Sequence, residues 1–177
     1  MRKDIVPSEE ECLKILKAHD VPENIIKHSI KVKELALEIC EMLKSRGIEV
    51  NEKLVVAGAL LHDLDKAKTL NSEKGYHGKV AAEELEKLGM KSVASIVRKH
   101  LLENLLRGEI KTIEEKIIFY ADKRVQDDKV VSLDERFEYL KKRYGLKDSS
   151  IMKIICESYP KVVELEKELV SWKKSLS

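Results

Sequence analysis

Several histidine and aspartate residues lie at positions that the helical spacing of this chain assigns to a buried, apolar face, where polar side chains are uncommon. His28 and His100 each continue an apolar stripe, and Asp122 does the same further along the chain. The dipeptide His62-Asp63 directly follows the longest uncharged apolar run. An ionised carboxylate on a buried face is costly unless it is paired or bound to a metal. We therefore expect these side chains to converge on one metal centre that is built from several helices.

The residue types are those of a catalytic transition-metal site. Imidazole nitrogens suit ions such as Fe, Ni and Zn, while carboxylates add oxygen donors that can bridge two ions. A zinc finger is excluded because no cysteine joins the set and the histidines lie far apart in the sequence. Adjacent side chains point about 100° apart on an ideal helix, so His62 and Asp63 can face one cavity if they lie at the helix end. A lone histidine on an apolar face is more often a hydrogen-bonded core residue, and the prediction therefore rests on the combination.

The elements that must position these residues are helices. Apolar periodicity predicts helices over about 8–19, 22–47, 51–64, 77–88, 91–106, 112–126, 133–143 and 149–171. Three of their starts have the spacing of a capping box, at Ser8/Glu11, Thr112/Glu115 and Ser132/Glu135. A polar loop is expected around Asn71-Ser72, and Val130-Val131 is too short to indicate a sheet. The fold class expected is all-α.

The domain organisation expected is a single helical bundle with an extension. A helical domain at 1–130, with its core at about 25–125, is followed by C-terminal helices at 131–177 that pack on the same domain. In the last helix the apolar positions are Val162, Leu165, Leu169 and Trp172. These positions would pack on the bundle or on a second subunit, so a homo-oligomer is left open.

The composition excludes several classes of protein. The 177 residues are 43% hydrophobic and carry 34 Lys+Arg against 32 Asp+Glu, a formal net charge of +2. This lacks the concentrated positive charge that sequence-independent nucleic-acid binding needs, and no apolar run approaches the roughly 20 residues of a membrane span. Cys12, Cys40 and Cys156 each lie in an apolar pattern, so we expect buried thiols rather than disulfides. No signal-peptide pattern is present at the N-terminus, and the cytoplasm is the expected location.

The order His28, His62-Asp63, Asp122 resembles the H…HD…D signature of the HD-domain superfamily of metal-dependent phosphohydrolases. The segment LLHDLDK at 60–66 is similar to the "LLHDIGK" segment of its HDIG-like subgroup, with Asp65 in place of the usual glycine. The resemblance covers roughly residues 25–125 and implies an HD-domain helical bundle.

Two further histidines extend the resemblance. His77 and His100 stand between the HD pair and the last aspartate, where binuclear members of the superfamily carry additional histidines. The stretch from His77 to Leu85 is similar to the pattern H-x-x-x-G-A-E-x-L, with Ala81 in place of its glycine. The resemblance implies one or two divalent transition ions (Fe, Mn, Ni, Co or Zn). The implied ligands of a first ion are His28, His62, Asp63 and Asp122, and Asp63 would bridge to a second ion held by His77 and His100.

Several charged residues near these ligands have expected roles. Asp63 and Lys66 are the expected catalytic residues, Asp63 as the bridging ligand and Lys66 as a positive charge for the substrate phosphate. Lys99 and Arg124 are further candidates for phosphate contacts. Asp65 and Asp128 are candidates for orienting ligands or positioning water. His19, at the end of the first helix, fits a cation at a helix C-terminus better than a metal ligand.

The function implied is hydrolysis of a phosphoester or phosphoanhydride of a small phosphorylated molecule, with a nucleotide preferred, by metal-activated water. No Ser-His or Cys-His nucleophile pair is evident in the sequence. A dinucleoside polyphosphate hydrolase is one alternative. A non-catalytic metal- or nucleotide-binding regulatory module is another. A cyclic-dinucleotide phosphodiesterase is disfavoured because no G-Y-P segment follows the HD pair.

Overall fold

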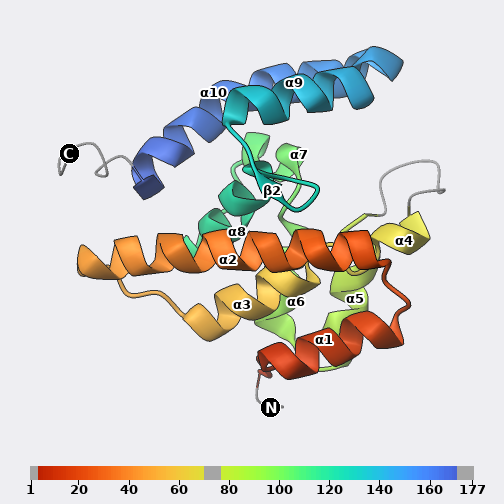
Figure 1. Cartoon of the computed structure of the whole chain (residues 1–177), viewed down its shortest axis with the longest axis vertical. Coiled ribbons are helices and arrows are strands. Elements are labelled where there is room, and N and C mark those ends of the chain that lie inside the picture. The colour runs from red at the N-terminus through yellow and green to blue at the C-terminus, as the bar shows by residue number, and fades with distance from the viewer. Residues whose placement is uncertain (1–3, 70–76, 171–177) are drawn as a thin grey trace.

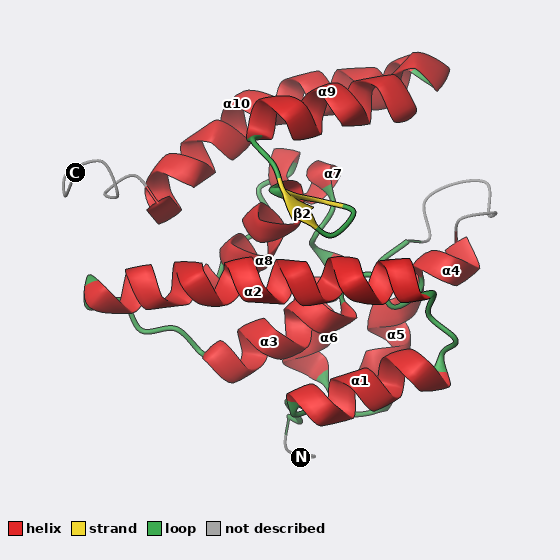
Figure 2. Cartoon of the chain, in the orientation of Figure 1, coloured by secondary structure: helices red, strands yellow, loops and turns green. Residues whose placement is uncertain are grey.

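The computed structural model describes residues 4–69 and 77–170. Its helices are α1 (Glu9–Ala18), α2 (Glu23–Ser45), α3 (Glu52–Leu61), α4 (Lys66–Thr69), α5 (Lys79–Lys87), α6 (Lys91–Arg98), α7 (Leu102–Leu106), α8 (Ile113–Lys123), α9 (Leu133–Arg143) and α10 (Ser149–Val170), with a 3₁₀ turn η1 at Gly145–Lys147. Two short strands, β1 (Val125–Gln126) and β2 (Lys129–Val130), form an antiparallel hairpin. The all-α class is thus confirmed (Figure 2). The expected loop at Asn71-Ser72 and the expected packing of Trp172 lie outside the described residues.

The long helix α2 runs through the middle of the molecule (Figure 1). One side of it packs with α3 and α8 around Val32, Ile39 and Ile118. A second core lies among α1, α3, α5 and α6, around Leu16 and Leu60. The two cores are separate groups of buried side chains, and α2 and α3 contribute to both.

Close helix packing beneath α2 depends on a glycine in α3. A Cβ added at Gly58 would lie 2.5 Å from Cδ1 of Ile118 and 3.0 Å from Cγ2 of Ile96. The missing side chain therefore lets α6 and α8 approach α3 closely. The three capping boxes expected from the sequence form as predicted, at Ser8/Glu11, Thr112/Glu115 and Ser132/Glu135.

The C-terminal helices α9 and α10 lie together above α2 in Figure 1. α10 packs against α7, α8 and α2, and its residues Val162, Leu165 and Leu169 join the core that contains α2 and α8. In the described residues no helix is long and apolar enough to cross a membrane. Cys12 and Cys40 are buried as expected, but Cys156 is exposed because the buried face of α10 at this point is formed by Ile155.

Three helix boundaries differ from the sequence prediction. The segment 91–106 is two helices, since the chain turns at His100 and Leu101 is extended at φ −86° and ψ 156°. The segment 112–126 ends at Lys123, where the chain enters the β-hairpin. The segment 51–64 ends at Leu61. Proposed ligands lie at or near all three ends. A side chain at a helix end can take a direction that is closed to a side chain within the helix.

Candidate metal centre

His28 lies in the first turns of α2 on its buried face, and both ring nitrogens have partners. The Nδ1 atom lies 2.8 Å from the carbonyl oxygen of Asp127, in the turn of the β-hairpin. A carbonyl oxygen only accepts hydrogen bonds, so Nδ1 carries the proton. Nε2 points inward and lies 3.1 Å from Oδ1 of Asp122, near the end of α8. The hairpin therefore fixes the tautomer and the direction of this imidazole.

His62 and His100 are oriented in the same way by their own helices. Nδ1 of His62 lies 2.7 Å from the carbonyl oxygen of Ala59, and Nδ1 of His100 lies 2.6 Å from that of Val97. The last carbonyls of a helix have no intrahelical donor, so a histidine just past the helix end can use one. Nε2 of each ring faces the interior, where Nε2 of His100 lies 3.1 Å from Nε2 of His77. This places His62 at the end of α3, the location expected for it.

His77 is oriented by a carboxylate. Its Nδ1 donates to Oδ1 of Asp65 over 2.7 Å, and Oδ2 of Asp65 accepts the backbone N–H of Ala81 over 3.0 Å. Asp65 is thereby buried and connects the chain after α3 to the first turn of α5. Gly78, at φ +78°, lets the chain before α5 lie close to the end of α6, because a Cβ there would lie 3.0 Å from the carbonyl oxygen of Val97.

Asp63 lies between two pairs of histidines. Its Oδ2 atom is 3.5 Å from Nε2 of His62 and 3.9 Å from Nε2 of His28. Its Oδ1 atom is 3.0 Å from Nε2 of His77 and 3.7 Å from Nε2 of His100. One carboxylate oxygen thus faces each pair.

The structure groups these six side chains into two sets of potential ligands. The first set is His28, His62 and Asp122, and the second is Asp63, His77 and His100; within each set the ligand atoms lie within 4.8 Å of one another. Nε2 of His62 is buried and has no hydrogen-bond partner within residues 4–69 and 77–170. A buried polar atom without a partner is unfavourable, and a metal ion would satisfy it. Nitrogen and carboxylate donors in this mixture fit divalent transition ions.

The two aspartates of the cluster are ionised. Burial alone would raise the pKa of Asp63, but the imidazole of His62 and the ammonium of Lys66 hold the pKa of its carboxyl well below the usual range. Burial would also raise the pKa of Asp122, but the charge of Lys123, with the hydrogen bonds from His28 and His62, holds the pKa of that carboxyl well below its usual range. Both carboxylates are therefore in the charge state that binds a cation.

In the second histidine pair, His77 and His100, the pKa values of the two rings are shifted in opposite directions. Burial and the neighbouring rings of His77 and His62 lower the pKa of His100 to about 3. Burial also acts to lower the pKa of His77, yet hydrogen bonds to Asp63 and Asp65 raise it to about 9. Nε2 of His77 lies 3.1 Å from Nε2 of His100. A cation that binds between these rings takes the place of this proton, so metal binding and protonation compete.

Two lysines lie beside the carboxylates of Asp63 and Asp122. Nζ of Lys66 donates to Oδ2 of Asp63 over 2.8 Å. Nζ of Lys123 donates to Asp122 and, over 3.0 Å, to the carbonyl oxygen of His100. Sequence reasoning selected Lys66 but missed Lys123. The available signal was its position beside Asp122, directly after the apolar run from Ile117 to Ala121.

The other residues with expected roles lie away from the cluster. Nζ of Lys99 donates to Glu115 over 2.6 Å. The guanidinium of Arg124 donates to the carbonyl oxygen of Val131 and to Glu166 of α10. Asp128 is exposed in the hairpin turn. His19 ends α1, as expected, and its Nδ1 lies 3.3 Å from a carboxylate oxygen of Glu84. The structure does not bring these four residues to the ligands, because each is held by, or exposed in, another part of the fold.

A pocket of about 450 Å³ adjoins the cluster. One side of it is formed by proposed ligands, among them Asp63 and His100, and by the two lysines. It is also lined by apolar residues of the C-terminal helices, Leu140, Ile154 and Ile155. The C-terminal helices therefore supply a wall of the cavity into which the ligands face.

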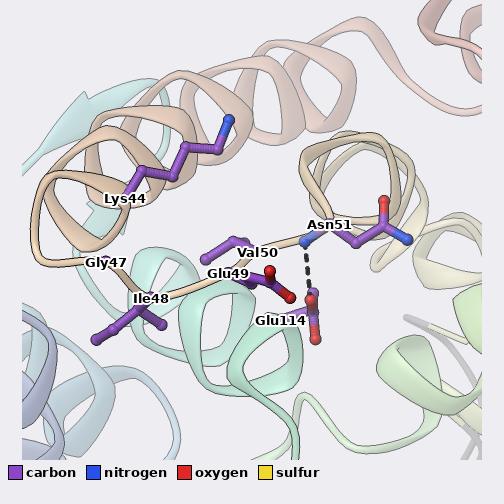
Figure 3. A pocket seen from close by; sticks show the side chains of 7 residues that line it. All are labelled: Lys44, Gly47, Ile48, Glu49, Val50, Asn51 and Glu114. Atoms are coloured by element: carbon purple, nitrogen blue, oxygen red, sulfur yellow. Dashed lines mark hydrogen bonds between the residues drawn. The ribbon is translucent and has the colours of Figure 1, made fainter.

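A larger and more open hollow of about 710 Å³ lies elsewhere, where α2 connects to α3. Figure 3 shows Lys44, Glu49 and Glu114 around it, with the backbone N–H of Asn51 donating to Glu114 over 2.9 Å. None of the proposed ligands is among the described residues that line it.

Comparison with known proteins places this geometry in a family. The HD domain matches residues 25–125. The uncharacterized protein MJ0778 of Methanocaldococcus jannaschii is 34% identical over 159 residues, which are 82% of this chain and 92% of that protein. The tRNA (cytidine(56)-2'-O)-methyltransferase of Thermoplasma volcanium is 32% identical over 159 residues, but these are only 44% of its length. No solved structure matches the chain.

A shorter match concerns a phosphodiesterase. The dihydroneopterin 2',3'-cyclic phosphate phosphodiesterase of Methanocaldococcus jannaschii is 41% identical over 49 residues, which are 27% of this chain and 20% of that protein. The HD match, by contrast, covers more than half of the chain and spans every residue of the H…HD…H…H…D order from His28 to Asp122. The chain belongs to the HD-domain family.

Proposed function

We propose that the protein is a metal-dependent phosphohydrolase that cleaves a phosphoester or phosphoanhydride bond of a small phosphorylated molecule, with nucleotides as the preferred class. The observation that carries the proposal is the position of Asp63 between two histidine pairs, with one carboxylate oxygen facing each pair. This arrangement supports two adjacent ions that share one carboxylate. His28, His62 and Asp122 would complete the first site, and His77 and His100 the second.

When bound, divalent ions supply Lewis acidity, which makes water a stronger nucleophile and neutralises charge on phosphoryl oxygens. The chain's own residues supply the rest. Four imidazoles have Nδ1 fixed as a donor, so Nε2 is the nitrogen of each ring that is left to face an ion. On His77, whose pKa is raised to about 9, an ion would have to displace a proton. These contacts orient the site before substrate arrives.

Lys66 and Lys123 bring positive charge to the same pocket. Burial would lower the pKa of Lys66, but the charge of Asp63 outweighs it and raises the pKa, so the ammonium persists at neutral pH. Such a charge attracts a phosphate and stabilises the leaving oxygen while water adds to phosphorus and the P–O bond breaks. The apolar wall at Leu140, Ile154 and Ile155 suits the ring of a nucleotide.

The test is hydrolysis of a panel of phosphate compounds, with metal content measured on the same samples. The panel holds p-nitrophenyl phosphate, nucleoside monophosphates, 2',3'-cyclic nucleotides and a dinucleoside polyphosphate, each with Mn, Fe, Co or Ni. We expect the wild type to retain metal and hydrolyse at least one class. His62→Ala removes a proposed ligand, so its metal content should fall and its activity should fall by at least about 100-fold.

His19→Ala is the matched control, because His19 is a histidine outside the cluster and should change neither quantity. Equal metal content in His62→Ala and wild type would contradict the metal site. A metal-loaded wild type that binds nucleotide but hydrolyses no member of the panel would contradict the enzyme and support the regulatory module. Turnover of the dinucleoside polyphosphate alone, or of the cyclic nucleotides alone, would identify the bond cleaved.

A further inference from the structure

Arg136, on α9, lines the pocket beside the proposed ligands. Its Nε atom is buried and has no hydrogen-bond partner among the residues that the structure describes. Its guanidinium packs over the ring of Tyr139, with 5.5 Å between the central carbon and the ring centroid. That contact holds the planar group in place but satisfies none of its donors.

Two other arginines of the chain are paired with carboxylates. Arg98 donates to Glu86 over 2.8 Å, and Arg124 donates to Glu166 over 2.9 Å. For Arg136 no carboxylate lies within ion-pair distance among the described residues. An unpaired guanidinium donor that is shielded from water is costly unless a ligand satisfies it. The location in a pocket therefore points to a ligand with anionic oxygens.

The surroundings define the kind of ligand. Guanidinium donors form a planar fork that matches two oxygens of a phosphate or carboxylate. Leu140, Ile154 and Ile155 line the pocket on the side of the C-terminal helices. An apolar wall lowers the local dielectric and strengthens a charged hydrogen bond beside it. It also offers contact area to the organic part of a substrate.

We propose that Arg136 is a substrate-binding residue that contacts an anionic oxygen of the substrate, while the neighbouring wall of α9 and α10 contacts the substrate's apolar or aromatic part. This inference rests on the proposed hydrolase function and deepens it. It makes the C-terminal helices, which lie above α2 in Figure 1, the part of the fold that selects the substrate. The substrate class is then a phosphate compound with a ring or other apolar group, rather than a small inorganic phosphate.

The first experiment is steady-state hydrolysis of p-nitrophenyl phosphate, an aromatic phosphoester, by the metal-loaded wild type, Arg136→Gln and Arg136→Lys. Loss of a charged hydrogen bond weakens binding by roughly 10-fold or more. We expect KM to rise by that factor in Arg136→Gln with a smaller change in kcat, and to rise less in Arg136→Lys, which keeps the charge but not the fork. Metal content should stay at the wild-type value.

Arg143→Gln is the matched control, because Arg143 lies on the same helix, also packs over a tyrosine ring, and is exposed. It should leave KM unchanged. Thermal unfolding of each variant, followed by circular dichroism, shows whether a change in KM comes with a loss of structure. A wild-type KM in a folded Arg136→Gln, for a wild type that hydrolyses the ester, would overturn this inference and leave the hydrolase proposal intact.

A second readout does not depend on turnover. Calorimetric titration of inorganic pyrophosphate into protein without added metal measures the anion site alone. We expect weaker binding to Arg136→Gln than to wild type and Arg143→Gln. Equal binding to all three proteins would count against Arg136 as an anion contact. Weaker binding to Arg136→Gln in a protein that hydrolyses nothing would keep the anion site and reject the hydrolase.

Discussion

Asp65 shows how one residue can support a proposed metal ligand without being one of the proposed ligands itself. The HD-type segment usually has glycine at this position, whereas here a buried carboxylate accepts Nδ1–H of His77 and the N–H of Ala81. A carboxylate behind a ligating imidazole fixes the ring and increases its basicity. Asp65 therefore prepares His77 for the second of the two proposed ions.

We expect Asp65→Ala to lower the affinity for the second ion by about 10- to 100-fold, as loss of such an orienting partner does in other metal sites. Activity at limiting metal should fall and should be restored by excess metal. Titration of activity against metal concentration, with metal content by mass spectrometry, measures this. Asp128→Ala, which changes an exposed aspartate of the hairpin turn, should match the wild type. If both variants needed the same metal concentration, Asp65 would have no orienting role.

At the scale of the elements, Glu115 connects α6 to α8. One carboxylate oxygen accepts Lys99 and Ser95 from α6, and the other accepts the backbone N–H groups of Lys111 and Thr112 at the start of α8. The same residue completes the capping box of α8. Because α6 ends just before His100 and α8 carries Asp122, this one carboxylate sets the spacing of two ligand-bearing helices.

Glu115→Gln should destabilise the fold by about 1–3 kcal/mol at pH 7, the range for loss of a cap and a charged hydrogen bond. Burial would raise the pKa of Glu115, but the hydrogen bonds from Lys99 and the backbone outweigh it and lower the pKa. A lowered pKa gives stability above the unfolded value of 4.5 that is lost as pH falls through the folded value. The difference from wild type should therefore shrink below about pH 4.5.

Urea unfolding at pH 7 and at pH 4 measures this difference. Glu83→Gln, at an exposed position of α5, is the control and should stay within about 0.5 kcal/mol of the wild type at both values. A Glu115→Gln effect that does not change with pH would mean that the charge of the carboxylate is unimportant.

The helices could be predicted from the sequence to a large extent, because apolar periodicity and capping residues are local signals. The breaks at His100 and after Lys123 could not be predicted. They depend on contacts with distant segments, such as the bond between His28 and the hairpin carbonyl. The residues of the cluster were predictable from their types and order, but Arg136 was not, since only the packing of α9 over the pocket gives that residue a role.

For the whole molecule, the cluster joins segments that are far apart in the chain. Its side chains come from α2, the end of α3, the start of α5, the end of α6 and α8. Ligands therefore connect helices from both hydrophobic cores. An ion bound to the native state alone stabilises it by mass action, by about 4 kcal/mol at a concentration 1,000 times Kd.

Removal of metal with a chelator should therefore lower Tm by about 10 °C, since 1 kcal/mol corresponds to roughly 2–4 °C in a chain of this size. Differential scanning calorimetry before and after chelation, and after metal is added back, measures the shift. His62→Ala should melt at the same temperature with and without chelator. A wild type with the same indifference to chelator would contradict a metal that is bound by the folded state.

Three of the four imidazoles are oriented by main-chain carbonyl groups, those of Ala59, Val97 and Asp127. No side-chain replacement removes a carbonyl, so an alanine scan would pass over these contacts and detect only Asp65. At position 127 the backbone is left-handed, with φ 54°. Glycine and asparagine also tolerate that conformation, and either residue would present the same carbonyl group to His28. Most of the contacts that orient these imidazoles are thus not tested by side-chain substitution, because the path of the backbone provides them.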